Sequence, residues 1–163
     1  MREIKLTQGK IAIVDAELFD CLNGIKWHYD KGYAARNVWV NGKRRITYMH
    51  RIIMNTPVGL DTDHINGNKL DNRRINLRVC TSKENQRNKI LPSNNSSGYK
   101  GVSWHKATGK WDARIKINGA TIHLGLFVNK EEAAHTYNKA ALKLFGQFAR
   151  LNEVQCNEGG FCG

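Results

Sequence analysis

Asp63 and His64 stand side by side near the middle of the chain, and Asn76 and Asn85 follow at spacings that allow them to fold back. Carboxylate and carboxamide oxygens are ligands that Mg²⁺ accepts, and this ion usually keeps several of its waters. An imidazole with a pKa near ~6.5 can take a proton from water at neutral pH. The four residues therefore contain the parts needed for one-metal hydrolysis of a phosphodiester.

The residue types suggest a separate role for each position. Asp63 can supply the charged metal ligand, and Asn85 a second oxygen ligand. His64 follows Asp63 on a predicted strand, so it points to the opposite side locally and can serve as the base. Asn76 can fix the tautomer or the orientation of the histidine from the intervening loop.

A strand, a loop, a second strand and a helix are predicted to position these side chains. Residues 62–65 indicate a strand end, Asn66-Gly67 a turn, and residues 77–80 a second short strand. Thr81 and Glu84 have the spacing of a capping box, which predicts a helix with Asn85 in its first turn. The other polar residues of the loop, Asn68, Asp71 and Asn72, are expected to be turn residues.

The first sixty residues are predicted to form a β-rich layer. Residues 33–40 and 43–49 are strand-like and are separated by Asn41-Gly42. This dipeptide favours a tight type I′ hairpin because both residues tolerate positive φ. The second strand is part of a basic arm, KRRITYMHR, which ends at His50 and Arg51.

A Ser-, Asn- and Gly-rich linker, residues 91–97, separates a second region that has its own periodicity. Residues 99–105, 110–117 and 121–127 are predicted strands, followed by a helix that Asn129 caps and Gly146 ends. The final residues, 153–163, are expected to be a loose tail, without a role for Cys156 or Cys162.

The strand at 110–117 alternates between apolar and polar residues. The expected inner face contains Trp111, Ala113, Ile115 and Ile117, with Ile122 and Leu124 of the next strand. The expected outer face contains Lys110, Asp112, Arg114 and Lys116, with Thr121 and His123. A basic sheet face backed by a helix is suited to the DNA major groove, although an ordinary solvated face has the same composition. The face of Trp104 stays open because its strand does not alternate cleanly.

Charge and composition narrow the class of partner. The chain has 163 residues, 26 Lys and Arg against 14 Asp and Glu, a net charge of +12 and a pI near 9.8. Such a balance favours nucleic acid, with a merely solvated basic surface as the alternative. The cysteines form no C-x-x-C pair, so no zinc site is predicted. Without a long apolar run or a secretion signal, we expect a cytoplasmic protein that makes no membrane contact.

The motifs MHRIIM at 49–54 and DHINGNKLDNRRINLRVCTSKENQRN at 63–88 resemble the HNH nuclease family, which has the ββα-metal fold and includes homing endonucleases. The resemblance implies that Asp63 and Asn85 bind the metal. It makes His64 the general base and gives Asn76 the task of holding the histidine loop. His50 belongs to the element that precedes the motif, with phosphate contact and packing both open.

Residues 98–152 resemble the Apetala/ethylene-response-factor DNA-binding domain, a three-stranded sheet backed by one helix. YKGV, GKW, HLG and EEAAHTYNKAA carry the likeness. The resemblance implies a set of DNA-facing residues, to which Trp104 is added: Lys100, Ser103, His105, Lys110, Arg114, Lys116, Thr121 and His123. Ser103 and His123 depart from the family pattern, so base specificity is not carried over.

Together these observations predict an α+β chain with an HNH unit at 1–90 (core motif 49–89), the linker, a DNA-binding domain at 98–152 and the tail. The predicted function is that of a homing-type, metal-dependent DNA endonuclease. It would use Mg²⁺ or Mn²⁺ on double-stranded DNA, with no further small-molecule cofactor, in the host cell of a phage or mobile element. The alternatives are a non-cutting DNA-binding regulator and, less favoured, an RNA-binding module. The sequence does not predict the target site, whether one or both DNA strands are cut, or the oligomeric state.

Overall fold

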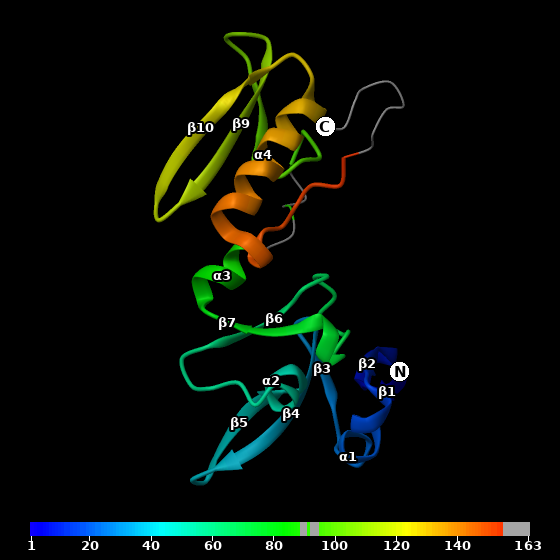
Figure 1. Cartoon of the computed structure of the whole chain (residues 1–163). Helices are drawn as coiled ribbons and strands as arrows, with labels where there is room; N and C mark the ends of the chain where they lie inside the picture. The colour runs from blue at the N-terminus through cyan, green and yellow to red at the C-terminus, as the bar shows by residue number, and fades with distance from the viewer. Residues whose placement is uncertain (89–90, 92–94, 155–163) are drawn as a thin grey trace. The chain divides into compact units, whose positions relative to one another are not determined.

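The computed structural model describes residues 1–88, 91 and 95–154 (Figure 1). The chain divides into two compact units, Met1–Asn88 and Lys89–Gly163. Its strands pair in antiparallel sheets with few helices, so the predicted α+β class is confirmed. No helix within the described ranges is long and apolar enough to cross a membrane. Most of the predicted tail, including Cys156 and Cys162, and part of the predicted linker lie outside the described residues.

Unit 1 is built from short strands and three small helices. Its elements are β1 Arg2–Lys5, β2 Ile11–Val14, α1 Phe19–Asn23, β3 His28–Asp30, β4 Tyr33–Val40, β5 Lys43–Tyr48, α2 Met49–Ile53, β6 Asp61–His64, β7 Leu77–Cys80 and α3 Ser82–Arg87. The sheets are β1-β2, β3-β4-β5 and β6-β7. Apolar side chains from β1, β2, α1, β4 and α2 form the core, with Trp27 and Met49 among them.

The β4–β5 hairpin turns at the predicted dipeptide. Asn41 has φ 49° and Gly42 has φ 70°, the positive values that a type I′ turn requires. Six residue pairs join the two strands, from Ala35 opposite Tyr48 to Val40 opposite Lys43. The turn predicted from Asn41-Gly42 is therefore present.

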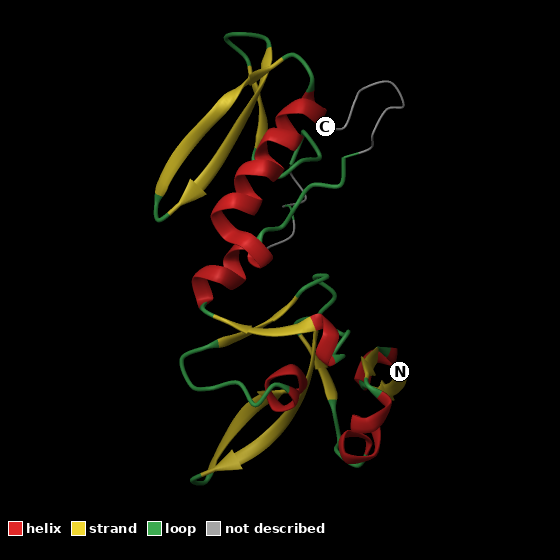
Figure 2. Ribbon diagram, in the orientation of Figure 1, coloured by secondary structure: helices red, strands yellow, loops and turns green. Residues whose placement is uncertain are grey.

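Unit 2 consists of β8 Val102–His105, β9 Lys110–Ile117, β10 Ala120–Phe127 and α4 Lys130–Phe145. The sheet has the order β10-β9-β8, and α4 lies along one face of it (Figure 2). Alanines and aromatic residues of the helix pack on Val102, Ala113 and Ile115 of the sheet. The Asn129 side chain accepts a hydrogen bond from the Glu131 backbone N–H, so the predicted cap is present.

A close approach between sheet and helix depends on Gly101. Its φ is +75°, and a Cβ there would lie 2.1 Å from the ring of Tyr137 and 2.6 Å from the carbonyl oxygen of Arg114. Only glycine permits both this backbone conformation and this contact. The register pairs Ile122 with the buried Ile115, so Ile122 lies on the predicted inner face. It is nevertheless exposed and is not part of either core cluster.

Candidate active site and nucleic-acid interface

Strand β6 and helix α3 bring acidic and amide side chains together in unit 1. The antiparallel register places Asp63 opposite Arg78 on β7. Helix α3 begins with the predicted capping box, in which the Thr81 hydroxyl accepts from the Glu84 N–H and the Glu84 carboxylate accepts from the Thr81 N–H. This cap sets the start of the helix, and its turns carry Asn85 and Asn88 to β6.

The buried Asp63 carboxylate is held by two neighbours. Arg78 donates to Asp63 Oδ2 from Nε at 2.9 Å and from Nη2 at 2.6 Å. Asn88 Nδ2 lies 3.1 Å from Asp63 Oδ1 and 3.0 Å from Oδ2, and also reaches the carbonyl oxygens of His64 and Ile65. Asn88 therefore fixes the carboxylate to the end of β6.

Asn85 contacts Asp61 rather than Asp63. Its Nδ2 donates to Asp61 Oδ2 at 3.2 Å, and the Ser82 hydroxyl donates to the same oxygen at 3.0 Å. Asp61 and Asp63 are two residues apart on a strand, so both side chains leave the same face of β6. The predicted ligand pair thus belongs to a larger group of four side chains on one side of the strand: Asp61, Asp63, Asn85 and Asn88.

This group has the donor chemistry that suits a hard cation. It contains two carboxylates and two carboxamides, which offer oxygen atoms and no thiolate or imidazole. Within the described ranges, no three His, Cys, Asp or Glu side chains gather as a metal-binding cluster. A cation at β6 would draw on amide oxygens of Asn85 and Asn88 in addition to the two carboxylates, an all-oxygen set of the kind that hard cations prefer.

His64 lies on the other side of β6, as the alternation of a strand predicts. Its side chain is buried, with a residue exposure of 5%, and its ring meets the rings of His50 at 5.0 Å and Tyr33 at 6.0 Å. Nε2 has no hydrogen-bond partner among the described residues. Burial lowers the pKa of His64, while Asn72 and the Asp63 charge act in the opposite sense. The ring is therefore neutral at pH 7, the state that a general base requires.

His50 forms the back of the same cluster of rings. Tyr48 stacks on it at 5.6 Å with an interplanar angle of 10°, and Tyr33 lies 5.2 Å away. Burial, followed by the neighbouring charge of His64, lowers the pKa of His50 to about 3. A neutral buried ring offers no positive charge to a phosphate, so this geometry favours the packing alternative.

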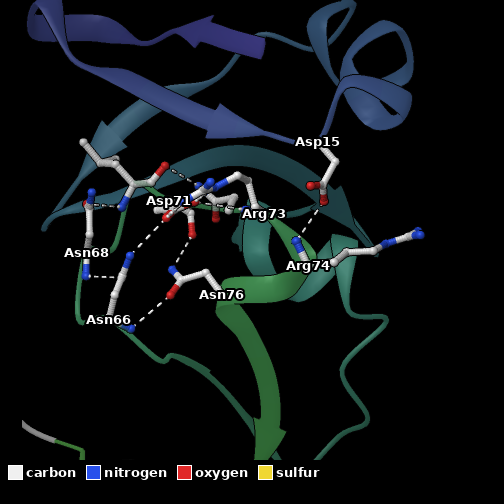
Figure 3. A network of polar contacts seen from close by, with 9 residues as sticks. Asp15, Asn66, Asn68, Asp71, Arg73, Arg74 and Asn76 are labelled. Atoms are coloured by element: carbon white, nitrogen blue, oxygen red, sulfur yellow. Dashed lines mark hydrogen bonds and ion pairs between the residues drawn. The ribbon is translucent and has the colours of Figure 1, made fainter. Parts of the chain in front are cut away.

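Asn76 closes the loop between β6 and β7 (Figure 3). Its Oδ1 accepts from the Asn66 N–H at 2.9 Å, and its Nδ2 donates to the Asp71 carbonyl oxygen at 2.8 Å. These bonds hold the loop that begins directly after His64. The side chain next to the His64 ring is Asn72, so Asn76 acts on the loop and not on the tautomer.

Asp71, expected to be an ordinary turn residue, is the buried centre of this loop. Arg73 donates to its two carboxylate oxygens at 2.7 and 2.6 Å, and Asn66 Nδ2 donates at 3.0 Å (Figure 3). The hydrogen bond from Arg73 lowers the pKa of Asp71. Backbone bonds from Ile13 to Leu70, and from Asn72 to Ile13, tie the loop to β2. The loop is therefore a rigid support for His64.

In unit 2 the strand register collects polar side chains on the sheet face opposite α4. Directly paired residues share a face, which assigns to this side Ser103, His105, Lys110, Asp112, Arg114, Lys116, Thr121 and His123. Asp112 is only 2% exposed because its neighbours cover it. Arg114 Nη2 lies 2.5 Å from Asp112 Oδ2, and His123 Nε2 lies 3.2 Å from Oδ1. Asp112 therefore orients two residues of the predicted DNA-contacting set.

Two members of the predicted set lie elsewhere. Trp104 pairs with Trp111, and their rings meet at 5.0 Å and 68°, which places Trp104 on the helix side of the sheet. Lys100 precedes β8 and lines a cavity of about 350 Å³ with Arg150 and Asn152. Burial, followed by the charge of Arg150, lowers the pKa of Lys100 to about 8. Neither residue shares the basic face with Arg114.

Several residues of the site were not anticipated. Asn88 follows Asn85 by three positions, a helical spacing that places both on one face and was available as a signal. Arg78 could be found by pairing the two predicted strands around the loop. Tyr33 and Tyr48 reach the histidines through the register of β3, β4 and β5, for which the sequence offers no local signal.

Comparison with known proteins identifies the family. Residues 47–87 match the family model described as HNH endonuclease. A protein of Acanthamoeba polyphaga mimivirus, named an uncharacterized HNH endonuclease, is 31% identical over 149 residues, which covers 90% of this chain and 77% of the relative. This chain belongs to the HNH endonuclease family. Protein 3.8 of Escherichia phage T7 is 37% identical over 95 residues, covering 58% of the chain and 78% of that protein.

The second unit of this HNH protein has plant relatives. Residues 97–147 match the model of the AP2 domain. The AP2-like ethylene-responsive transcription factor TOE2 of Arabidopsis thaliana is 38% identical over 63 residues, which is 39% of this chain and 13% of the factor. The predicted combination of an HNH nuclease region with an AP2-type region is therefore confirmed.

Proposed function

We propose that this HNH protein is a homing-type DNA endonuclease that depends on Mg²⁺ or Mn²⁺. Unit 1 hydrolyses the phosphodiester, and the AP2 unit holds duplex DNA through its basic sheet face. The observation that carries the proposal is the arrangement at β6. A neutral buried histidine, His64, whose Nε2 has no partner among the described residues, stands directly beside the Asp63 carboxylate. A second carboxylate, Asp61, lies on the same strand face, and the amide side chains of Asn85 and Asn88 contact these two carboxylates.

The candidate metal ligands are Asp63 and Asn85, with Asp61 and Asn88 adjoining. A divalent ion bound there would stabilise the charge that develops on the phosphate and the departing 3′ oxygen. Asp63 must release at least one of its present donors to take part, because Arg78 and Asn88 now occupy its oxygens. Arg78 is then left as a cation close to an anionic substrate.

The residues of the chain divide the remaining work. His64 accepts the proton of the attacking water, and the water oxygen bonds to phosphorus as the 3′ oxygen departs. His50 and Tyr33 fix the plane of the His64 ring by contact, and Asn76 holds the loop after it. Because Asp63 and His64 project to opposite sides of β6, a phosphodiester that uses both must lie across the end of that strand.

A non-cutting DNA-binding regulator is the second candidate. The ion pair between Asp63 and Arg78 favours it, since a carboxylate committed to an arginine is a poor metal ligand. The presence of Asp63, His64 and Asn85 in one chain argues for the nuclease. The two candidates differ in one observable, the breaking of DNA strands.

Incubation of the full chain with supercoiled plasmid and phage genomic DNA tests the proposal. We expect nicked or linear products with Mg²⁺ or Mn²⁺ and none with EDTA, and discrete cut sites in a genomic library if the enzyme is of the homing type. DNA binding without strand breaks under either metal would support the regulator. Frequent cleavage at unrelated sequences would support a nuclease and contradict the homing type.

A further inference from the structure

The β4–β5 hairpin presents aromatic, aliphatic and cationic side chains that neither the candidate active site nor the AP2 sheet uses. Trp39, near its turn, is 73% exposed, which is unusual for so large an apolar side chain. Three successive cations, Lys43, Arg44 and Arg45, are also exposed. None of the three forms an ion pair with a described residue.

The strand register distributes these cations over both faces of the hairpin. Arg44 pairs with Trp39, so the two share one face. Lys43 and Arg45, its neighbours in sequence, project to the other face, where they pair with Val40 and Val38. The hairpin is therefore not divided into an apolar face and a polar face. Each of its two faces carries both positive charge and apolar surface.

This distribution favours one kind of partner. A flat acidic protein or an anionic lipid surface can meet only one face of a ribbon, which would leave the other charges unused. A groove of duplex DNA has a phosphate wall on each side. The major groove, about 12 Å wide, admits a two-stranded ribbon, and its floor presents base edges to a side chain such as Trp39. We infer that the β4–β5 hairpin enters the major groove as a second DNA-binding element of the chain.

The connection to the candidate active site limits where the hairpin can bind. β5 ends at Tyr48, which stacks on His50, and His50 contacts the His64 ring. Arg44 lies four residues before Tyr48, about 13 Å away at ~3.3 Å per strand residue. The tip of the hairpin, at Asn41, is seven residues before Tyr48. At about 3.4 Å per base pair, that strand length corresponds to roughly seven base pairs. The inference rests on the proposed function, because it places the contact within this distance of the cut.

Matched variants of the full chain test the hairpin. The double variant Arg44→Ala/Arg45→Ala removes two charges from it, and Lys5→Ala/Lys26→Ala removes two exposed charges elsewhere in unit 1. Trp39→Ala tests the apolar contact separately. After wild-type cut sites are mapped with Mg²⁺, binding to one site is measured in EDTA at several salt concentrations. Dimethyl sulfate probing then reports guanine N7 in the major groove and adenine N3 in the minor groove.

We expect the arginine variant to flatten the slope of log affinity against log salt by roughly 1.8, or 0.9 for each phosphate contact. Guanine N7 protection within about seven base pairs of the cut should disappear in this variant and in Trp39→Ala. The lysine variant should keep the wild-type slope and protection. Thermal unfolding verifies that the variants are folded.

Two results would overturn the inference alone. Hairpin variants that keep the wild-type slope and protection would exclude DNA contact by the hairpin. Protection of adenine N3 in place of guanine N7 would move the contact to the minor groove. Neither result concerns cleavage by the wild-type protein, so neither contradicts the proposed function. A wild-type chain that neither binds nor cuts DNA would overturn both proposals together.

Discussion

Each unit buries an aspartate against an arginine on an antiparallel ladder, yet the surroundings of the two pairs differ. Asp63 in unit 1 lies 2.6 Å from Arg78, whose side chain is only 13% exposed. Asp112 in unit 2 lies 2.5 Å from Arg114, whose side chain is 51% exposed. The first arginine is enclosed with its partner, whereas the second extends from its partner into solvent.

The neighbours decide what each carboxylate can do. Asp61 lies on the same strand face as Asp63, so a second carboxylate stands near the place where a cation could replace the arginine. Asn88 donates to Asp63 through its amide nitrogen, and its side chain also carries an oxygen. Asp112 is paired only with Arg114 and His123 in the described part of unit 2. It therefore anchors cations that point outward. Under the proposed function, the aspartate–arginine pair of unit 1 adjoins the chemistry, and that of unit 2 orients a DNA-binding surface.

Substituting the two aspartates should separate cutting from binding, with the largest effects of the series. We expect Asp63→Asn to lower Mg²⁺-dependent cleavage by ~10²-fold or more, because the site loses a charged ligand. Mn²⁺ should restore part of the activity, since it binds oxygen and nitrogen sites more tightly by the usual divalent order. Asp112→Asn should leave cleavage chemistry intact and weaken DNA binding by releasing Arg114 and His123.

Single-turnover cleavage at saturating protein and fluorescence anisotropy of the same duplex measure the two properties. Asp20→Asn, an exposed carboxylate of unit 1, is the matched control. Full Mg²⁺-dependent activity in Asp63→Asn would show that another carboxylate serves the metal, with Asp61 the nearest on the same strand face.

The stability of unit 1 should depend on pH through its buried histidine, His50. His50 is buried as a neutral ring with a pKa of about 3, while an unfolded chain titrates it near 6.5. The unfolded state therefore binds more protons between these values, so stability is full above pH 6.5 and falls as the pH decreases. From pH 7 to pH 5 the free energy of unfolding should drop by about 2 kcal/mol through His50.

Denaturant unfolding of wild type and His50→Phe at both pH values isolates this contribution. The variant keeps an aromatic ring for Tyr48 to stack on and removes the titrating group. The drop in unfolding free energy should be smaller in His50→Phe than in wild type. Equal drops would mean that His50 is protonated without penalty in the folded protein.

Local signals predicted many of the strands and helices α3 and α4, whereas β1, α1, β3 and α2 were not predicted. Long-range pairing set the features that the sequence did not reveal. The capping box at Thr81 and the turn at Asn41-Gly42 are read from a few adjacent residues. The burial of Asp112 depends on His123, which reaches it from another strand. Asp71 belongs to a residue type and a segment that are typical of turns. The contacts of its loop with β2 exist only after folding. The contact of Asn85 with Asp61 likewise requires the placement of α3 on β6.

The smallest expected effects concern individual residues of the AP2 sheet. Arg114→Ala should flatten the salt dependence of binding by roughly 0.9 if its guanidinium meets a phosphate. If it meets a guanine edge, base preference at one position should relax by about 1–3 kcal/mol instead. Trp104→Phe should change neither, because Trp104 lies on the helix side. Anisotropy on a panel of single-base variants of the site distinguishes these outcomes, and a binding loss in Trp104→Phe would contradict the assigned face.

The most direct test of the proposed active site compares wild type with His64→Ala on one labelled duplex that contains a mapped cut site. Cleavage is followed with Mg²⁺, and affinity is measured in EDTA. We expect a cleavage rate ~10²–10⁴-fold lower in the variant, the usual contribution of a general base, with affinity within about twofold of wild type. Undiminished cleavage by His64→Ala would remove the histidine from the chemistry and contradict the proposed active site.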